Sequence, residues 1–385
     1  MRIGVDGRAF ASPAGGVRRY VTELYAAIRA LDPSVEIVAV GADERTDLPA
    51  GVVRRGATSF PTNLGWMGAS LPLAVRGAAL DVFHAPAYQA PLWGVRPLAL
   101  TIHDVSYARH PEWHPYKNDP FRRAFYRRSA RTADWIVTDS AFSRSEIAAA
   151  YQIPASRISV VPLAASPRFT PGPFDPAALP SAVRHPYALH VGDLHARRNL
   201  AAALAAVLAV RRLGVQLTFV CAGVDRGIAA ALRGDATRAT DPDALVLTGS
   251  LDDHALVNLY RGAAMLLYPS RYEGFGLPVL EAMQCGTPVI SARAASMPEI
   301  MGETGVLVDP LDVDGWSRAI VEILEDGIRR TALSEAGLRR AAEFSWTRTA
   351  RETLAVFQHL LHASTSSTPP TSSTPPTPNS TRTAL

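Results

Sequence analysis

The sequence predicts an α/β protein with two doubly wound parallel-sheet domains that face each other across a cleft. Short β-branched runs alternate with longer amphipathic stretches along most of the chain, which is typical of parallel sheets with helices on both faces. A proline-rich segment, residues 166–186, interrupts this alternation once, and the alternation then restarts. The length of 385 residues also suits two domains and a tail better than one core.

The first half contains six segments that we expect to be strands. They alternate with helical patterns, of which Val17, Val21 and Leu24 are an example after two glycines. Ser140 is a good N-cap for a helix over residues 141–151. The expected strands are residues 3–5, 36–40, 81–84, 98–103, 135–138 and 158–161. Residues 1–165 form the first predicted domain.

The second half repeats the pattern after a predicted linker, residues 166–186, which holds six prolines. The expected strands are residues 187–191, 216–221, 245–247, 265–268, 288–291 and 306–308, followed by helices over 312–325, 327–343 and 347–362. Residues 187–346 form the second predicted domain, and the helix 347–362 is expected to pack back on the first. The tail, residues 363–385, repeats Ser, Thr and Pro and is expected to be disordered.

Composition narrows the functional class. Hydrophobic residues make up 48% and charged residues 19%, which fits a well-packed enzyme. The formal charge of +4 (39 − 35) does not require nucleic acid as a partner. The two cysteines, Cys221 and Cys285, exclude a disulfide framework and suit a reducing cytosol. We see no leader at the N-terminus and no apolar run near the ~20 residues that span a bilayer, so we expect a cytoplasmic protein, peripheral to the membrane at most.

Ligands of open parallel sheets bind beyond the carboxyl ends of the strands, so the loops after strands should carry the chemistry. The strongest candidate follows the strand 265–268. There Gly274 and Gly276 allow close backbone approach before a helix N-terminus, while Glu273 and Glu281 can accept hydrogen bonds from hydroxyls. Glu281 could instead only complement the helix dipole. A nicotinamide fingerprint is discounted, because Val279 holds the third glycine position.

Two further loops suit phosphate. Arg197 and Arg198 follow the strand 187–191 and precede a helix, where they could hold a diphosphate. The alternative is a solvated basic helix start, which the helix dipole disfavours. Gly15 and Gly16 form another amide-rich turn before a helix, although glycines in turns are common.

Three other motifs are more ambiguous. His103 and Asp104 lie at the end of a strand, where His103 faces the predicted cleft, but His103 could be structural and Asp104 could orient a turn or cap. The segment 121–128 has three aromatic residues that could form one helical face among four arginines, which suits an anionic membrane or a lipid-phosphate acceptor. An ordinary packed helix is the commoner explanation. Asp312 and Asp314 have the D-x-D pattern of metal-dependent transferases but sit where helix caps are ordinary, so no metal site is expected.

Together these motifs resemble the family-4-type retaining glycosyltransferases, also called glycosyl transferases group 1, and the resemblance runs in order over about residues 3–360. It implies the GT-B fold, in which two Rossmann-like domains face across a cleft. The motifs are residues 15–20, 103–104, 138–143, 161–163, 192–199, 269–283, 296–299 and 344–346. The spacing of Glu273 and Glu281, with seven residues between them, is the most specific of these in its ordered context.

The resemblance also implies roles for individual residues. His103, Arg197, Arg198 and Glu273 would be catalytic: His103 contacts the sugar, the arginines neutralise the diphosphate, and Glu273 holds sugar hydroxyls. Glu281 would bind the ribose. The remaining donor-binding residues would be Gly15, Gly16, Gly192, Gly274, Phe275, Gly276 and Leu277. The family usually has Arg-Lys where this chain has Arg197 and Arg198. The resemblance therefore implies the contact with the leaving diphosphate less directly for Arg198 than for Arg197.

The implied reaction moves a hexose from a nucleoside-diphosphate sugar to a hydroxyl of a glycan, glycolipid or small molecule, with retention and without a metal cofactor. Members with the nearest pattern transfer mannose, rhamnose and related sugars in polysaccharide or O-antigen assembly, so GDP-mannose is the expected donor, with UDP and dTDP sugars left open. A nucleotide-sugar epimerase on the same fold is the runner-up. A non-catalytic carbohydrate-binding protein is a third interpretation, which the intact Glu273 and arginine pair disfavour.

Overall fold

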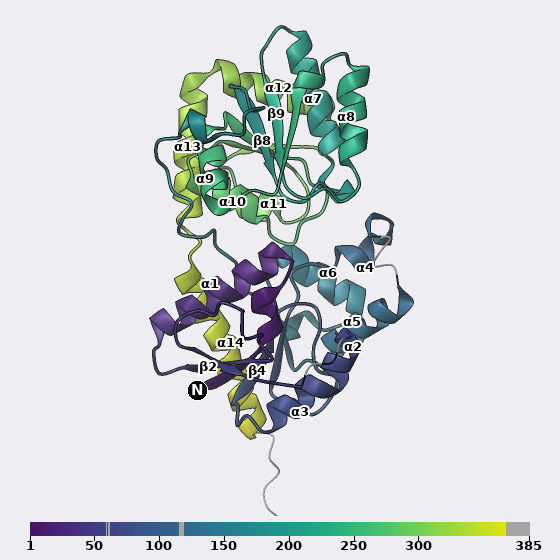
Figure 1. Cartoon of the computed structure of the whole chain (residues 1–385), viewed down its shortest axis with the longest axis vertical. Coiled ribbons are helices and arrows are strands. Elements are labelled where there is room, and N and C mark those ends of the chain that lie inside the picture. The colour runs from purple at the N-terminus through teal and green to yellow at the C-terminus, as the bar shows by residue number, and fades with distance from the viewer. Residues whose placement is uncertain (59, 61, 115–118, 367–385) are drawn as a thin grey trace, which may run out of the picture.

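The computed structural model describes residues 1–58, 60, 62–114 and 119–366, and shows two α/β lobes, one above the other in Figure 1. The N-terminal lobe is purple to blue, and the C-terminal lobe is teal to green (Figure 1). Each lobe is built on one parallel sheet, with seven strands in the first and six in the second. The predicted fold class is therefore confirmed. Residues 367–385 of the predicted disordered tail lie outside the described part of the chain.

The N-terminal sheet has the strand order β3-β2-β1-β4-β5-β6-β7. Its strands are β1 (Arg2–Asp6), β2 (Glu36–Val40), β3 (Val52–Arg55), β4 (Val82–Ala85), β5 (Leu98–Thr101), β6 (Trp135–Thr138) and β7 (Ile158–Val160). The helices of this lobe are α1 (Gly15–Leu31), α2 (Asn63–Gly65), α3 (Leu71–Arg76), α4 (Ser106–Arg109), α5 (Pro120–Thr132) and α6 (Ala141–Tyr151). Ser140 is the N-cap of α6 as predicted, since its Oγ accepts from the amide of Ser143 at 3.0 Å.

The C-terminal sheet has the order β10-β9-β8-β11-β12-β13. Its strands are β8 (Tyr187–Val191), β9 (Thr218–Ala222), β10 (Leu245–Gly249), β11 (Met265–Tyr268), β12 (Val289–Ala292) and β13 (Val306–Val308). The helices that follow are α7 (Leu200–Arg212), α8 (Ala229–Arg238), α9 (Asp253–Gly262), α10 (Leu277–Gln284), α11 (Met297–Met301), α12 (Val313–Glu325), α13 (Gly327–Ala341) and α14 (Trp346–Ser366). Strands β8, β9 and β11 are wholly buried, as expected of strands covered on both faces.

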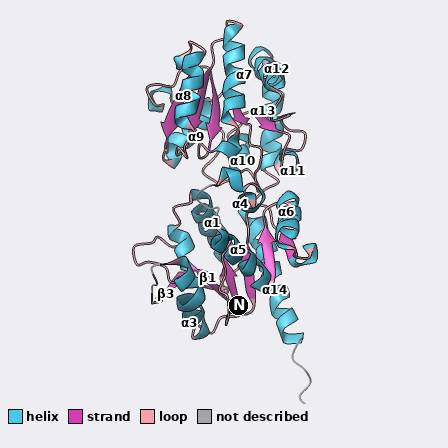
Figure 2. Cartoon of the chain, turned by 90° about the vertical axis from the view of Figure 1, so that its right-hand side faces the viewer, coloured by secondary structure: helices cyan, strands magenta, loops and turns pink. Residues whose placement is uncertain are grey.

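The strand order determines where a ligand can bind. In the C-terminal sheet the order reverses between β8 and β11, which pair in parallel. Ligands of doubly wound sheets bind beyond the carboxyl ends of the strands at such a reversal. The loops that leave β8 and β11 are residues 192–199 and 269–276, the two strongest candidates from the sequence. In both views α10 and α11 lie at the edge of their lobe that faces α1 and α6 of the other lobe (Figures 1 and 2).

Strand β3 was not predicted from the sequence. It lies at the edge of the N-terminal sheet and pairs only with β2 among the described strands. Val53 in its middle is 57% exposed, and two arginines follow it. A short edge strand of this kind buries too little apolar surface to show a clear pattern, and charged residues are common there.

Helix α14 leaves the C-terminal lobe and packs on the N-terminal lobe, where it lies against α1, β4 and β6 (Figure 1). The side chain of Phe357 is fully buried with its ring 5.5 Å from that of His84. The hydroxyl of Thr349 donates to the carbonyl of Pro162 at 2.7 Å. Throughout the described residues, no helix combines the length and apolar character that crossing a bilayer requires.

Candidate active site

His103 and Asp139 form a largely enclosed pair at the carboxyl edge of the N-terminal sheet. They follow neighbouring strands, β5 and β6, so the parallel register brings them together. The Nδ1 atom of His103 lies 2.8 Å from Oδ2 of Asp139. Burial lowers the pKa of His103, but the charge of Asp139 and its hydrogen bond outweigh burial, so the pKa is raised above its ordinary value. The ring of Tyr20 meets the imidazole edge to face at 4.9 Å and limits its movement.

Arg197 and Arg198 lie together in a short turn after β8, at the carboxyl edge of the C-terminal sheet. Arg197 reaches the other lobe, where its guanidinium lies 3.2 Å from Oδ2 of Asp104. Arg198 contacts the Tyr268 hydroxyl and Oε1 of Glu273. Burial lowers the pKa of Arg197, but Glu273 and Asp104 outweigh it and raise the pKa, so the guanidinium stays charged. The sequence placed these arginines at a strand end, and the structure brings them to Glu273.

The loop glycines make room for this cluster. Gly192 has φ +127°, and a Cβ there would lie 3.3 Å from the Arg198 guanidinium. Glu273 is only 6% exposed, and Arg198 is the ion-pair partner nearest to it. The Nε atom of Arg198 is buried without a hydrogen-bond partner among the described residues. Buried donors are rarely left unsatisfied, so this N–H marks a place where a ligand oxygen could bind.

The two lobes touch at Gly274. A Cβ on Gly274 would lie 2.1 Å from the carbonyl oxygen of His103, so only glycine permits this approach. The hydroxyls of Ser140 and Ser143 donate to the Gly274 carbonyl at 2.6 and 3.2 Å. Nearby, the carboxylate of Glu299 accepts from the amide of Ala141 at the start of α6. The Gly274 loop of the C-terminal lobe is therefore held beside the His103 loop of the N-terminal lobe.

Glu281 lies in the second turn of α10 and is 2% exposed. Its Oε2 accepts from the Tyr260 hydroxyl at 2.8 Å, and its Oε1 contacts the guanidinium of Arg19 from α1. Burial raises the pKa of Glu281, against the opposing effects of Arg19 and Tyr260. Glu281 therefore does more than complement the dipole of α10, since its carboxylate lies at the boundary between the lobes.

The other predicted donor-binding residues lie at two helix N-termini. Gly276, with φ +108°, precedes α10, which has no side-chain cap and begins at Leu277. The Phe275 side chain is 4% exposed and packs on Phe344 at 5.9 Å, so only its backbone is available to a ligand. Gly15 and Gly16 begin α1, and a Cβ on either would meet nothing within 4 Å. Each N-terminus carries backbone amides that have no partner within its own helix and that can bind an anion.

The segment 121–128 does not form one aromatic face. Phe121 is 87% exposed while Tyr126 is 7% exposed, because α5 turns Tyr126 toward the core. The Tyr126 ring meets that of Tyr107 at 4.9 Å. Arg123 and Arg127 line a hollow of about 540 Å³ between α4, α5 and α6. The predicted packed helix is therefore present, and its basic side remains at the surface.

The remaining candidates behave as ordinary structure. Asp312 is an N-cap, since its Oδ1 accepts from the amide of Gly315 at 2.8 Å. Within the described ranges, no group of three or more His, Cys, Asp or Glu residues is arranged to hold a metal ion.

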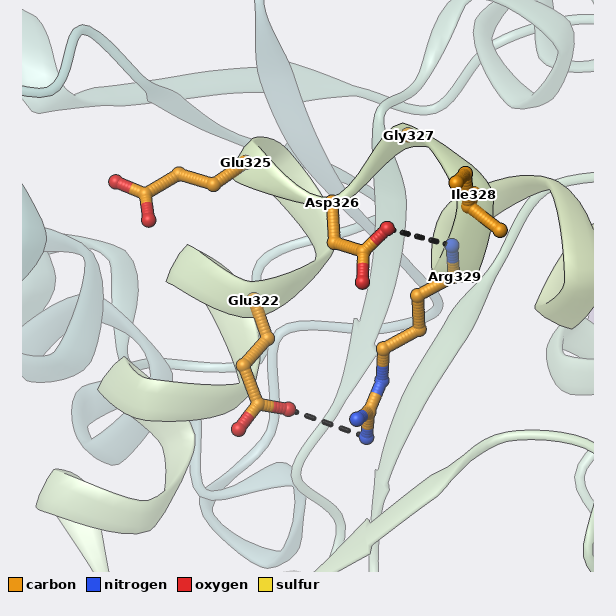
Figure 3. Close-up of a pocket in the computed structure, with 6 residues that line it drawn as sticks. All are labelled: Glu322, Glu325, Asp326, Gly327, Ile328 and Arg329. Atoms are coloured by element: carbon orange, nitrogen blue, oxygen red, sulfur yellow. Dashed lines mark hydrogen bonds and ion pairs between the residues drawn. The ribbon is translucent and has the colours of Figure 1, made fainter.

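A surface hollow at the α12–α13 corner is lined by Glu322, Arg329 and four neighbours (Figure 3). Glu322 and Arg329 pair at 3.1 Å, and no predicted site residue lines this hollow.

Sequence reasoning did not assign roles to three residues that the structure brings to the site. Asp139 pairs with His103, Arg19 contacts Glu281, and Tyr268 contacts Arg198. Asp139 and Tyr268 each stand at or just beyond the end of a strand, which is the signal that could have found them. Arg19 gives no such signal, because it lies on a helix and its partners come from the other lobe.

Comparison with known proteins identifies the class. The family described as Glycosyltransferase Family 4 matches residues 14–169, and Glycosyl transferases group 1 matches residues 185–326. O-antigen chain mannosyltransferase B of Escherichia coli is 33% identical over 286 residues, which cover 72% of this chain and 74% of that protein. D-inositol 3-phosphate glycosyltransferase of Thermobispora bispora is 29% identical over 392 residues, covering 90% of each.

The fold agrees with these relatives. Sucrose-phosphate synthase from Thermosynechococcus elongatus superposes with a TM-score of 0.73 at 20% identity, over 94% of this chain and 100% of that one. The two facing parallel-sheet lobes are those of a GT-B glycosyltransferase. The chain belongs to the glycosyl transferases group 1, with a family 4 N-terminal half.

Proposed function

We propose that this glycosyltransferase moves a hexose, with mannose favoured, from a nucleoside-diphosphate sugar to a hydroxyl acceptor and retains the anomeric configuration. The observation that carries the proposal is the cluster of Arg197, Arg198 and Glu273 held against His103 across the lobes. GDP-mannose is the favoured donor, since two relatives that match 72% and 30% of the chain are mannosyltransferases. A glycan or a lipid-linked glycan is the proposed acceptor.

The chemistry follows from charge. Breaking the anomeric bond places negative charge on the departing nucleoside diphosphate and positive charge on the sugar. Arg197, Arg198 and the free amides of α10 supply preorganised positive charge for the leaving group, so the proposed reaction needs no divalent metal. Glu273 would accept hydrogen bonds from sugar hydroxyls, and Glu281 from the ribose. The leaving phosphate would take the proton of the acceptor hydroxyl on the same face of the sugar.

The proposed location is the cytoplasm, with contact at the inner face of the membrane through residues 121–128. Phe121 and three arginines of α5, Arg122, Arg127 and Arg128, are exposed. A basic surface with a projecting aromatic ring suits anionic lipid or a phosphate-bearing acceptor. Pelleting with vesicles of anionic lipid, compared with neutral vesicles, tests this contact. Equal recovery with both kinds of vesicle would remove it from the proposal.

A thermal-shift screen of GDP, UDP, dTDP and their sugars tests the donor, because a ligand that binds only the folded state raises Tm. We expect GDP-mannose to give the largest shift. If only UDP or dTDP sugars raised Tm, the donor would be one of these instead of GDP-mannose.

Labelled donor incubated without acceptor separates the alternative functions. Slow hydrolysis supports a transferase, a converted nucleotide sugar indicates an epimerase, and an unchanged donor indicates a binding protein.

A further inference from the structure

Arg19 crosses from the N-terminal lobe to the carboxylate that is expected to bind ribose. It lies on the first turns of α1, and its guanidinium makes two contacts in the C-terminal lobe. One nitrogen, Nη1, contacts Oε1 of Glu281, and the other, Nη2, lies 2.9 Å from Oδ1 of Asp253 at the start of α9. The guanidinium also lies over the ring of Phe169, at 5.4 Å from its centroid. The Arg19 side chain is 24% exposed, so this is a largely enclosed contact.

Both oxygens of Glu281 therefore have protein donors, Arg19 on Oε1 and Tyr260 on Oε2. A ribose brings two neutral hydroxyl donors to the same carboxylate. Tyr260 belongs to the same lobe as Glu281 and can stay, but Arg19 comes from the facing lobe and occupies the oxygen at the boundary. A nucleoside that reaches Oε1 from between the lobes meets the Arg19 side chain first.

Asp253 links Arg19 to a second arginine, Arg168. It accepts Arg19 on one oxygen and Arg168, from the predicted linker, on the other. Asp253 and Glu281 are two like charges bridged by one cation, and the charge of Asp253 raises the pKa of Glu281. Arg19 therefore offsets a repulsion within the C-terminal lobe while it joins that lobe to the other.

We propose that Arg19 is a further residue of the donor site that competes with the donor nucleoside for Glu281, so that Arg19 gives up its contact with Oε1 when the donor binds. The inference rests on the proposed function, because it takes Glu281 as the ribose acceptor. When the ribose hydroxyls take Oε1, Arg19 loses one of its two ionic partners and the contact between α1 and α10 weakens. By linkage, the factor by which the nucleoside weakens the Arg19–Glu281 contact equals the factor by which that contact weakens nucleoside binding. Removing the contact must therefore strengthen nucleoside binding.

The test measures nucleotide affinity in variants of the full chain. Arg19→Met keeps an unbranched, shorter side chain and removes the cation. Arg18→Met is the matched control, because Arg18 is its neighbour on α1 and its guanidinium donates to the carbonyl of Ser12 in its own lobe. Titration calorimetry with GDP and UDP at pH 8 gives the dissociation constants. We expect Arg19→Met to bind the preferred nucleotide about fivefold tighter or more, in the range of ordinary coupling energies, and Arg18→Met to match the wild type.

A second variant keeps the inference testable if Arg19→Met folds poorly. Asp253→Asn removes one arm of the contact and keeps the Glu281 carboxylate in the site, so a smaller tightening is expected. Steady-state kinetics adds a readout that a purely structural role would not move: Arg19→Met should lower the donor KM while kcat stays level or falls. Circular dichroism checks that each variant is folded.

The outcomes separate the inference from the proposed function. If the wild type binds a nucleoside diphosphate and Arg19→Met binds it no tighter than Arg18→Met does, the competition is refuted and the proposed function stands. If neither the wild type nor any variant binds any nucleoside diphosphate, the proposed function fails and the inference fails with it. Tighter binding in both Arg19→Met and Asp253→Asn supports the coupling.

Discussion

The Nδ1 atom of His103 lies 2.8 Å from Oδ2 of Asp139, and the two residues come directly beyond neighbouring strands of the N-terminal sheet. This contact orients the imidazole and favours its protonated form near the boundary between the lobes. A carboxylate that pairs with a histidine in this way is a positioning group, because it acts on the substrate only through the ring.

The first prediction concerns the pKa of His103. Asp139→Asn removes the negative charge, and burial then dominates, so we expect the pKa of His103 to fall below its ordinary value of about 6.5. Because the wild-type pKa is raised, the pair stabilises the fold fully below the unfolded-state pKa and loses this effect as pH rises through the folded-state pKa. NMR titration of the histidine rings measures the shift. An unchanged His103 pKa would refute the pairing, and His185 serves as the ring that should not move.

The second prediction concerns Glu273. Glu273→Ala leaves Arg198 buried without its partner, so we expect a loss of about 3–5 kcal/mol in the free energy of unfolding together with loss of transfer. Glu273→Gln keeps the size and one hydrogen-bond acceptor, so it should unfold at a denaturant concentration nearer to that of the wild type, but transfer sugar at least about a hundredfold more slowly.

Denaturant unfolding and a donor-transfer assay separate the two effects, with Glu325→Gln on an exposed helix end as control. Wild-type stability in Glu273→Ala would contradict the buried ion pair. Wild-type turnover in Glu273→Gln would contradict the proposed contact with the sugar.

The third prediction concerns the arginine that replaces the lysine expected from the family resemblance. One guanidinium nitrogen of Arg198, Nη1, contacts the Tyr268 hydroxyl, the Glu273 carboxylate and Ser270 Oγ at 3.4 Å, and the Nε–H stays available to a ligand, a second donor that lysine lacks. We expect Arg198→Lys to keep part of the activity, with kcat about tenfold lower, and Arg198→Met to lose about 10²–10³-fold.

Steady-state kinetics at saturating donor measures both variants. Arg226→Lys is the control, because Arg226 pairs with Asp193 near the same loop but at the surface. Equal kcat values for the Lys and Met variants would show that the charge of Arg198 plays no part.

The fourth prediction concerns the helix that joins the lobes. Phe357 on α14 is fully buried in the N-terminal lobe, so Phe357→Ala should create a cavity and lower the free energy of unfolding by about 3–5 kcal/mol. Gln358→Ala, at the exposed neighbour, should change it by less than about 0.5 kcal/mol. Chemical denaturation compares them, and similar values for both would mean that α14 does not pack as described.

Local patterns account for most of what could be predicted. The strand 265–268 and the capped helix after Ser140 follow from hydrophobic runs and cap chemistry, which act over a few neighbouring residues. Edge strand β3 lacked such a signal. The three aromatic residues of α5 differ in burial, because the neighbouring helices decide which of them is covered and their own spacing does not.

The sequence by itself determined that two parallel sheets would present Arg197, Arg198, Glu273 and His103 in loops at strand ends. It could do so because a strand's length and direction set where its loop begins. Only the tertiary structure decided the reversal between β8 and β11, the pairing of Asp139 with His103, and the reach of Arg19 to Glu281. Those contacts join residues far apart in the chain, and their energies depend on burial and distance in space, which spacing along the sequence does not encode.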